Sequence, residues 1–202
     1  MKIYLIRHGE TDWNKKRLLQ GKQDIPLNEK GIRVAKLTGE KLSQIKFDKV
    51  YASPLKRAYE TALLVTGGQY PVEKEPRLEE IGYGVCEGTS RDQDDPNLRV
   101  YFERPELYRA PEGGESIEAL YRRTWSFLQE LIRNPENADK TILLASHGAA
   151  LQGLMCMVRN QPVSAFWKDR ELRNCAVTIL NVQDGKITIE QENVLFYDEN
   201  AI

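Results

Sequence analysis

Short apolar runs alternate with segments of helical periodicity along most of the chain. Buried strands are predicted at three such runs, residues 2–7, 49–53 and 141–145. Helices are predicted at four segments, residues 28–45, 54–65, 117–132 and 149–158. Asn28 is a suitable cap for the first of these helices, and Gly67 and Gly68 end the second. This alternation predicts an α/β fold, a three-layer α/β/α sandwich around a mostly parallel sheet.

The remaining segments add a hairpin and an irregular region. Two apolar runs, 175–180 and 186–190, flank Asp184-Gly185 and predict a closing β-hairpin. We expect a loop with at most a short helix at residues 9–26. A short strand followed by a loop is expected at residues 70–88. Residues 89–115 are rich in Arg, Asp, Pro and aromatic residues without a clean period. We interpret 1–202 as a single domain in which 89–115 is an insertion that caps a site.

Composition narrows the class of partner. The chain has 202 residues, 41% hydrophobic and 29% charged, with a net charge of −1. This balance argues against nucleic acid or an acidic membrane surface as the main partner. Three cysteines without a Cys-x-x-Cys motif favour reduced thiols, and no membrane span or leader pattern is present. We therefore expect a cytoplasmic protein that binds neither nucleic acid nor membrane.

Both histidines of the chain follow a predicted buried strand and precede a glycine. His8 follows residues 2–7, and His147 follows the strand that starts at residue 141. In open α/β sheets, ligands bind beyond the carboxyl ends of parallel strands. Histidine is also the side chain best suited to chemistry near neutral pH. The sequence thus places both histidines where such a fold builds its active site.

Cationic and amide side chains accompany the histidines. Arg7 precedes His8, and its planar guanidinium can bind two oxygens of a tetrahedral anion, while Asn14 adds an amide donor. Arg57 lies in the first turn of a predicted helix, where a cation opposes the helix dipole unless an anion binds beside it. Lys56 is the competing candidate at this position.

A carboxylate and a helix N-terminus complete the predicted site. Glu79 and Glu80 lie in a glycine-rich loop and either could serve as a general acid. His147 and Gly148 directly precede a helix predicted from about Ala149, and the free amides of its N-terminus favour anions. Together these groups predict a pocket for a dianionic phosphoryl group. No metal-ligand pattern, glycine-rich phosphate loop or cofactor motif is found in the sequence.

The ordered motifs resemble those of the histidine phosphatase superfamily, the phosphoglycerate-mutase-like proteins. Residues 7–14 match the family's Arg-His-Gly-Glu-Thr/Ser-x-Trp-Asn opening throughout. Further matches occur in order at Gln20, Gly21, Asp24, Pro26, Leu27, Gly31, Ser53, Leu55, Arg57, Ala58, Thr61, Ala62, Leu78, Glu80, Ile81, Gly84, Glu87, Gly88, Gly114, Glu115, Ser116, Ser146, His147 and Gly148. The resemblance covers about residues 2–182. Cys86 stands where the family often has Trp, which we expect to change loop packing and not the acid.

The resemblance implies phosphoryl transfer through a phosphohistidine, with no metal and no cofactor. It assigns His8 as nucleophile and Glu80 as the acid, where spacing alone leaves Glu79 equally open. It implies a catalytic, phosphate-neutralising role for Arg7, Arg57 and His147. Further contacts to phosphate or substrate are implied for Asn14, Gln20, Gly21, Gly148 and Ala149.

Each of these residues also has an ordinary structural explanation. A single histidine is more often structural, Asn14 and Ser53 could be helix caps, and Arg57 could be a surface ion-pair partner. The joint, ordered occurrence overturns those explanations for Arg7, His8, Arg57, Glu80 and His147. For Ser53, capping of the following helix remains the favoured role.

Three functions are compatible with this pattern. They are a phosphatase for small phosphomonoesters, a phosphoglycerate mutase, and a non-catalytic protein that binds a phosphate ligand. The mutases usually have a longer chain with an added basic insertion, which residues 89–115 do not resemble. We therefore favour the phosphatase, with the leaving group left open.

Overall fold

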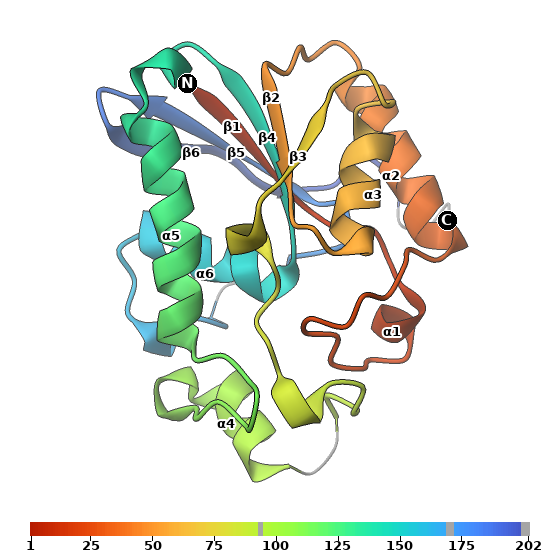
Figure 1. Cartoon of the computed structure of the whole chain (residues 1–202), viewed down its shortest axis with the longest axis vertical. Coiled ribbons are helices and arrows are strands. Elements are labelled where there is room, and N and C mark those ends of the chain that lie inside the picture. Colours follow the sequence, from red (N-terminus) through yellow and green to blue (C-terminus); the bar gives the residue numbers. More distant parts are fainter. Residues whose placement is uncertain (93–94, 169–171, 199–202) are drawn as a thin grey trace.

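A six-stranded sheet forms the centre of the molecule, in the order β3-β2-β4-β1-β5-β6 (Figure 1). The computed structural model describes residues 1–92, 95–168 and 172–198. The strands are β1 Lys2–Arg7, β2 Lys49–Ala52, β3 Val72–Lys74, β4 Thr141–Ser146, β5 Val177–Gln183 and β6 Lys186–Val194. β3, β2, β4 and β1 run parallel, and β5 and β6 are antiparallel to their neighbours. The predicted mostly parallel sheet with a closing hairpin is confirmed.

The hairpin turn has the backbone conformation that its sequence predicts. Asp184 and Gly185 have φ angles of 52° and 74°. A two-residue turn with both central residues at positive φ matches the twist of antiparallel strands and favours Asp-Gly. The first strand of the hairpin, β5, begins at Val177 and not at Cys175 as predicted. Cys175 has a φ angle of 55°, which interrupts the extended backbone.

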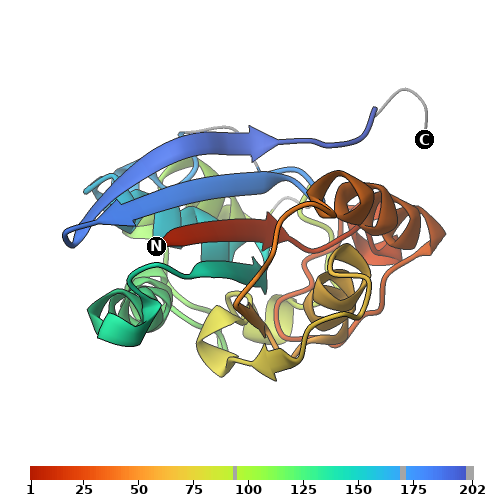
Figure 2. The ribbon, with the colours of Figure 1, turned by 90° about the horizontal axis from the view of Figure 1, so that it is seen from above.

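Helices cover both faces of the sheet. They are α1 Asp12–Lys15, α2 Glu29–Leu42, α3 Lys56–Val65, α4 Pro96–Glu103, α5 Ile117–Arg133 and α6 Gly148–Val158. α2 and α3 lie against one face and α5 and α6 against the other, which gives the three predicted layers (Figures 1 and 2). The Asn28 side chain accepts from the Gly31 amide and caps α2 as expected, but the helix ends at Leu42, short of Ile45.

Alternate residues of β1 enter the two cores. Tyr4 and Ile6 pack with α2 and α3, whereas Ile3 and Leu5 pack with α5 and α6. All four side chains are at most 5% exposed. Burying such a side chain contributes about 1.5–3 kcal/mol. The strand that precedes His8 is therefore fixed from both sides.

The segment 89–115 contains a helix that the sequence pattern did not predict. α4 begins at Pro96, and the Asp95 carboxylate accepts from the amides of Asn97 and Leu98. Asp before Pro at a helix start was the available signal, but the helix is too short to show a clear period. Tyr101 of α4 is fully buried among the aromatic rings of Tyr83, Tyr108, Phe102, Phe166 and Trp167.

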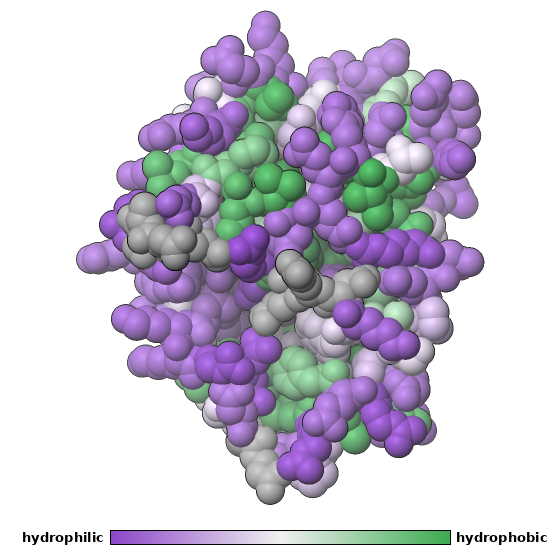
Figure 3. All heavy atoms as spheres, turned by 180° about the vertical axis from the view of Figure 1, so that it is seen from behind, coloured by the Kyte–Doolittle hydropathy of each residue, from purple (hydrophilic) through white to green (hydrophobic). Residues whose placement is uncertain are grey.

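The face of the molecule opposite to the view of Figure 1 is mostly hydrophilic. On this face, hydrophobic side chains form separate patches between hydrophilic ones (Figure 3). In the described part of the chain, no helix combines the length and the apolar character needed to cross a membrane.

Candidate active site

The carboxyl ends of β1 and β4 bring the two histidines together. β1 and β4 pair in register from Lys2 with Thr141 to Arg7 with Ser146, so the next residue of each is a histidine. The ring centroids of His8 and His147 lie 5.1 Å apart. Beside them is a cavity of about 70 Å³. Its wall includes nearly all of the predicted site residues: Arg7, His8, Asn14, Gln20, Gly21, Arg57, Glu80, Gly148 and Ala149. His147 lies behind this wall.

His8 is held with one ring nitrogen available. Its Nδ1 lies 2.7 Å from the carbonyl oxygen of Gly9, and because a carbonyl only accepts, Nδ1 carries the proton. Nε2 therefore keeps its lone pair. Burial, then the charges of Arg57 and Arg7, lower the pKa of His8 well below its usual 6.5. At neutral pH this ring is an uncharged potential nucleophile, only 2% exposed, at the cavity wall.

His147 has both ring nitrogens engaged by protein groups. Its Nδ1 accepts from Nε of Arg57 at 3.1 Å, because a guanidinium only donates. Its Nε2 then carries the proton and donates to Oγ of Ser53 at 2.7 Å. Burial, followed by the Arg57 charge, lowers the pKa of His147 well below 6.5. In this structure His147 orients Arg57, and contact with a phosphate would require it to exchange a partner.

Ser53 has a different role from the predicted helix cap. The N-cap of α3 is Leu55, and Pro54 precedes the helix. The Ser53 hydroxyl instead accepts from the Leu55 amide at 3.3 Å and from His147. Its place in a matched motif was the signal that pointed to a role in the site.

Arg57 is a fully buried guanidinium at the cavity wall. Besides His147, it donates to the carbonyls of Gln23 and Gly21 at 2.7 Å each. Burial lowers the pKa of Arg57 to about 10, so the side chain remains charged at pH 7. A buried cation of this kind is stabilised by an anion placed beside it.

The backbone conformation and the close packing at position 21 require glycine. Its φ angle is +51°, and a Cβ atom there would lie 2.0 Å from Oε1 of Glu87. Its carbonyl accepts from Arg57, while the neighbouring Gln20 is buried and its Oε1 has no hydrogen-bond partner among the described residues. Gln20 therefore offers a polar atom close to the cavity.

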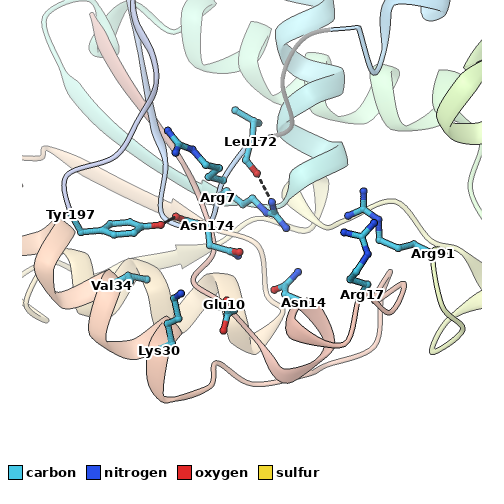
Figure 4. Close-up of a pocket in the computed structure, with 11 residues that line it drawn as sticks. Arg7, Glu10, Asn14, Arg17, Lys30, Val34, Arg91, Leu172, Asn174 and Tyr197 are labelled. Carbon is cyan, nitrogen blue, oxygen red and sulfur yellow. Dashed lines mark hydrogen bonds between the residues drawn. The ribbon is translucent and has the colours of Figure 1, made fainter. Parts of the chain in front are cut away.

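Arg7 and Asn14 lie on the side of the cavity that faces α1. Nη1 of Arg7 donates to the Leu172 carbonyl. Asn14 Oδ1 accepts from the amide and hydroxyl of Thr11 at 3.1 Å each, as part of a capping box. Asn14 is thus a helix-start residue and also a cavity residue, with its amide nitrogen directed toward Arg7 (Figure 4).

Glu80 and Glu79 point to different places. Glu80 is 8% exposed and lies on the cavity wall, whereas Glu79 pairs with Nζ of Lys22 at 3.2 Å. Oε1 of Glu80 accepts from the amides of Ile81 and Ala150, at 3.0 and 2.9 Å, and Oε2 accepts from that of Ala149 at 3.1 Å. A carboxylate has about four lone-pair sites, so Oε2 keeps one.

The N-terminus of α6 therefore binds a protein carboxylate. The Ala149 amide, which we expected to contact phosphate, donates to Glu80. In the described residues, no hydrogen-bond acceptor contacts the Gly148 amide. A Cβ atom on Gly148 would lie 3.5 Å from Nε of Arg7, at the cavity wall. Gly148 thus remains as the helix-terminal amide available to an anion.

Arg123 is a residue of this region that sequence reasoning missed. Its guanidinium donates to the carbonyls of Arg77, Glu79 and Glu80 at 2.7–3.0 Å. It also pairs through two nitrogens with the Glu115 carboxylate, at 2.7 and 2.8 Å. Arg123 thereby fixes the loop that carries Glu80. Its place in a predicted helix eight residues after Glu115 gave no signal of that contact.

The assembled site suits a small dianion. Arg7 and Arg57 face the cavity, and the two neutral imidazoles lie nearby. The Glu80 carboxylate has one lone pair on Oε2 without a hydrogen-bond donor among the described residues. The outer wall is formed by Tyr83, Arg91, Phe102, Trp167 and Leu172, among other residues. Within residues 1–92, 95–168 and 172–198, no group of three or more His, Cys, Asp or Glu side chains is arranged to hold a metal ion.

Comparison with known proteins gives one consistent family. The sequence profile of the histidine phosphatase superfamily (branch 1) matches residues 3–195. Phosphoserine phosphatase 1 of Hydrogenobacter thermophilus is 30% identical over 96% of this chain and 92% of its own length. A protein named "Probable phosphoglycerate mutase GpmB", from Yersinia pestis, is 33% identical over 92% of this chain and 86% of its own.

The fold agrees with that assignment. The structure of Bacillus stearothermophilus YhfR superposes with a TM-score of 0.89 at 34% identity, covering 95% of this chain and 96% of that one. A match at this identity over nearly the full length extends the likeness beyond the motifs. The chain belongs to branch 1 of the histidine phosphatase superfamily.

Proposed function

We propose that the protein hydrolyses small phosphomonoesters through a phosphohistidine at His8. The observation that supports this most strongly is the state of His8 itself. The ring is buried and neutral, its Nδ1 is tied to the Gly9 carbonyl, and its Nε2 is left for a cavity of about 70 Å³. Arg7 and Arg57 supply the positive charge that a phosphoryl dianion requires.

The reaction takes two in-line displacements. Glu80 enters the reaction with a proton on the free lone pair of Oε2. Nε2 of His8 attacks phosphorus, the phosphorus–oxygen bond to the leaving group breaks, and Oε2 of Glu80 gives its proton to the leaving oxygen. A water molecule then returns a proton to Glu80 as its oxygen attacks phosphorus. The bond to His8 breaks, and phosphate leaves. Arg7, Arg57 and the Gly148 amide stabilise the charge on the phosphoryl oxygens.

In this proposal His147 acts by positioning Arg57, and it joins the phosphate directly only if it exchanges one of its present partners. Asn14 adds an amide donor, and Gln20 lies within the same wall. Segment 89–115 caps the site, a role supported by its contribution of Arg91 and Phe102 to the cavity wall. No cofactor and no metal ion take part in either step.

The test is release of orthophosphate from p-nitrophenyl phosphate by the purified protein, with and without EDTA. We expect turnover that EDTA does not reduce, and none for His8→Ala. Glu79→Gln and Glu80→Gln form a matched pair of neighbouring carboxylates. The Glu80 variant should lose at least about a hundredfold in kcat and the Glu79 variant little. Full activity of His8→Ala would refute the assignment of the nucleophile.

Phosphoglycerate mutase activity is a second candidate, since the relative from Yersinia pestis carries that name. In that reaction the phosphohistidine returns its phosphoryl group to the product and not to water. Efficient conversion of 3- to 2-phosphoglycerate with little phosphate release would favour it over hydrolysis. Pure binding of a phosphate ligand, the third alternative, would show as affinity without turnover.

We further propose that the protein works in the cytoplasm on small molecules and not on nucleic acid. All three cysteines, Cys86, Cys156 and Cys175, are free thiols, which fits a reducing compartment. The net charge of −1 offers no general attraction to nucleic acid.

A further inference from the structure

The loop that carries Glu80 is irregular, and side chains from other elements hold its backbone. It contains one turn of 3₁₀ helix, Pro76–Leu78, followed by extended backbone at Glu79. Outside regular helices and strands, backbone carbonyl groups need donors from side chains or from water. The position of Glu80 therefore depends on which groups supply these donors.

Four consecutive carbonyl groups of the loop accept hydrogen bonds from two side chains. Nη1 and Nη2 of Arg123 donate to three of the four, at 2.7–3.0 Å. The hydroxyl of Ser146 donates to the remaining one at 2.6 Å. Arg123 belongs to α5, and Ser146 is the last residue of β4, so the loop is attached to two regular elements of the fold. The four carbonyl groups are those of Arg77, Leu78, Glu79 and Glu80.

Arg123 holds the backbone of Glu80 and not its carboxylate. A guanidinium has five N–H groups, and three of them donate to the loop carbonyls. The other two donate to the carboxylate oxygens of Glu115 at 2.7 and 2.8 Å, so Glu115 balances the charge. A cation in direct contact favours the ionised form of a carboxyl group. Arg123 therefore fixes the loop without opposing the proton that the acid has to carry.

The carboxylate of Glu80 is attached to a third element, α6. It accepts from the amides of Ala149 and Ala150, at 3.1 and 2.9 Å. Leu78 of the same loop is 1% exposed and packs with apolar residues of α5 and α6. A shift of the loop would move the remaining lone pair of Oε2 relative to a bound substrate. A misplacement of about 1 Å in a reacting group can cost about a hundredfold in rate.

The segment before α5 extends this attachment. The amide of Glu115 donates to the carbonyl of Gly82 at 2.8 Å, and the hydroxyl of Ser116 caps α5 by accepting from the amide of Ala119. Glu115 thus holds Arg123 and also the loop beyond Glu80. The two phosphoryl-transfer steps give no role to Glu115, Ser116 or Ser146, although all three lie in matched motifs. Attachment of the Glu80 loop accounts for them.

We propose that Arg123, together with Ser146, is a positioning residue for the general acid and sets where Oε2 of Glu80 lies relative to the leaving oxygen. This rests on the proposed phosphatase function, in which Glu80 gives its proton to that oxygen as the phosphorus–oxygen bond breaks. Substitution of Arg123 weakens this proton transfer and leaves the charge stabilisation by Arg7 and Arg57 intact. The loss of rate therefore depends on how strongly the leaving group needs a proton.

The experiment compares two substrates of similar shape, phenyl phosphate and 2,4-dinitrophenyl phosphate. Phenolate is a poor leaving group that needs a proton, whereas 2,4-dinitrophenolate leaves as the anion. On kcat/KM, Glu80→Gln should lose at least about a hundredfold more with phenyl phosphate than with the dinitrophenyl ester. Arg123→Gln should show the same selectivity, by about ten- to a hundredfold. Arg122→Gln, at the exposed neighbouring position of α5, should change neither value appreciably.

Two further variants make the role of Arg123 specific. Because Arg123 acts through Glu80, adding Arg123→Gln to Glu80→Gln should lower kcat/KM for phenyl phosphate by less than about threefold. Ser146→Ala removes one of the four loop contacts and should show a smaller loss, about threefold or more, with the same dependence on the leaving group. Thermal unfolding monitored by circular dichroism establishes that each variant is folded. Ser146→Ala carries the test if Arg123→Gln does not fold.

The outcomes separate this proposal from the phosphatase function. Equal losses with both substrates in Arg123→Gln and Ser146→Ala, or a full additional loss in the Glu80→Gln background, overturn the positioning role. Turnover by the unaltered protein then leaves the phosphatase standing. Equal losses with both substrates in Glu80→Gln refute the acid itself and the positioning role with it. Absence of turnover of both substrates by the unaltered protein refutes the phosphatase and everything that rests on it.

Discussion

The two His-Gly junctions are alike in sequence and differ in the structure on their C-terminal side. After His8 the chain turns into a loop before the four-residue helix α1, whereas His147 is itself the N-cap of the eleven-residue helix α6. The His8 ring bonds to its own neighbour's carbonyl and keeps Nε2 for the cavity. The His147 ring is held between Arg57 and Ser53 and lies behind the wall. Two identical dipeptides at the ends of paired strands thus give one imidazole with a ring nitrogen facing the cavity and one imidazole with both ring nitrogens bonded to protein groups.

The glycines differ as well. A Cβ atom on Gly9 would lie 2.7 Å from the backbone oxygen of Gly31, so the chain requires glycine there for close packing against α2. For a Cβ atom on Gly148, the three nearest atoms would belong to the side chains of Arg7 and Glu80, at 3.5–3.8 Å. The first glycine serves the fold, and the second keeps the helix terminus open to the cavity.

The largest effect should come from changing each histidine to glutamine. His8→Gln removes the nucleophile and should abolish turnover of p-nitrophenyl phosphate. His147→Gln removes the group that orients Arg57 and should lower kcat by about 10²–10³, the scale of losing one oxyanion contact. Steady-state kinetics of the two variants makes the comparison. Equal losses in both would contradict the difference in roles.

A smaller effect tests the Ser53–His147 contact. Ser53→Ala removes the acceptor for Nε2 of His147, and one such hydrogen bond contributes about 1 kcal/mol, so kcat/KM should fall about three- to tenfold. Thr66→Val is the control, because the Thr66 hydroxyl is also buried but bonds to Ala62 at the far end of α3. Both variants should lose stability, and only Ser53→Ala should lose activity. Unchanged kinetics in Ser53→Ala would remove Ser53 from the site.

Much of this molecule could be predicted from local pattern. The strands that end at Arg7 and Ser146, the cap at Asn28 and the Asp184-Gly185 turn are each specified by a few neighbouring residues. α4 was missed because two turns are too few to show a period. The contacts of His147 and Arg123 were missed because they join residues distant in sequence. The hydrogen bond from the Ala149 amide to Glu80 depends on how the loop of Glu80 meets the start of α6.

A further effect concerns stability and not activity, namely its dependence on pH. Both histidines have pKa values well below 6.5 in the folded protein and near 6.5 in the unfolded chain. The unfolded chain therefore binds more protons between those values. The stability is complete above about pH 6.5 and is lost as the pH falls, by at most about 1.4 kcal/mol per pH unit for each histidine. Thermal unfolding from pH 7.5 to 5 should show a shallower loss in the His8→Gln, His147→Gln double variant. An identical slope would contradict burial of both rings in neutral form.

The most direct test of the whole account is to trap the phosphoenzyme. The His147→Gln variant is quenched rapidly, without acid, during turnover of a substrate with a labelled phosphoryl group. Digestion and mass spectrometry then locate that group on the protein. We predict one acid-labile phosphoryl group on the peptide that contains His8, and none in His8→Gln, where His147 is still present. A phosphoryl group on His147 in that second variant, or on any residue other than His8 in the first, would contradict the account.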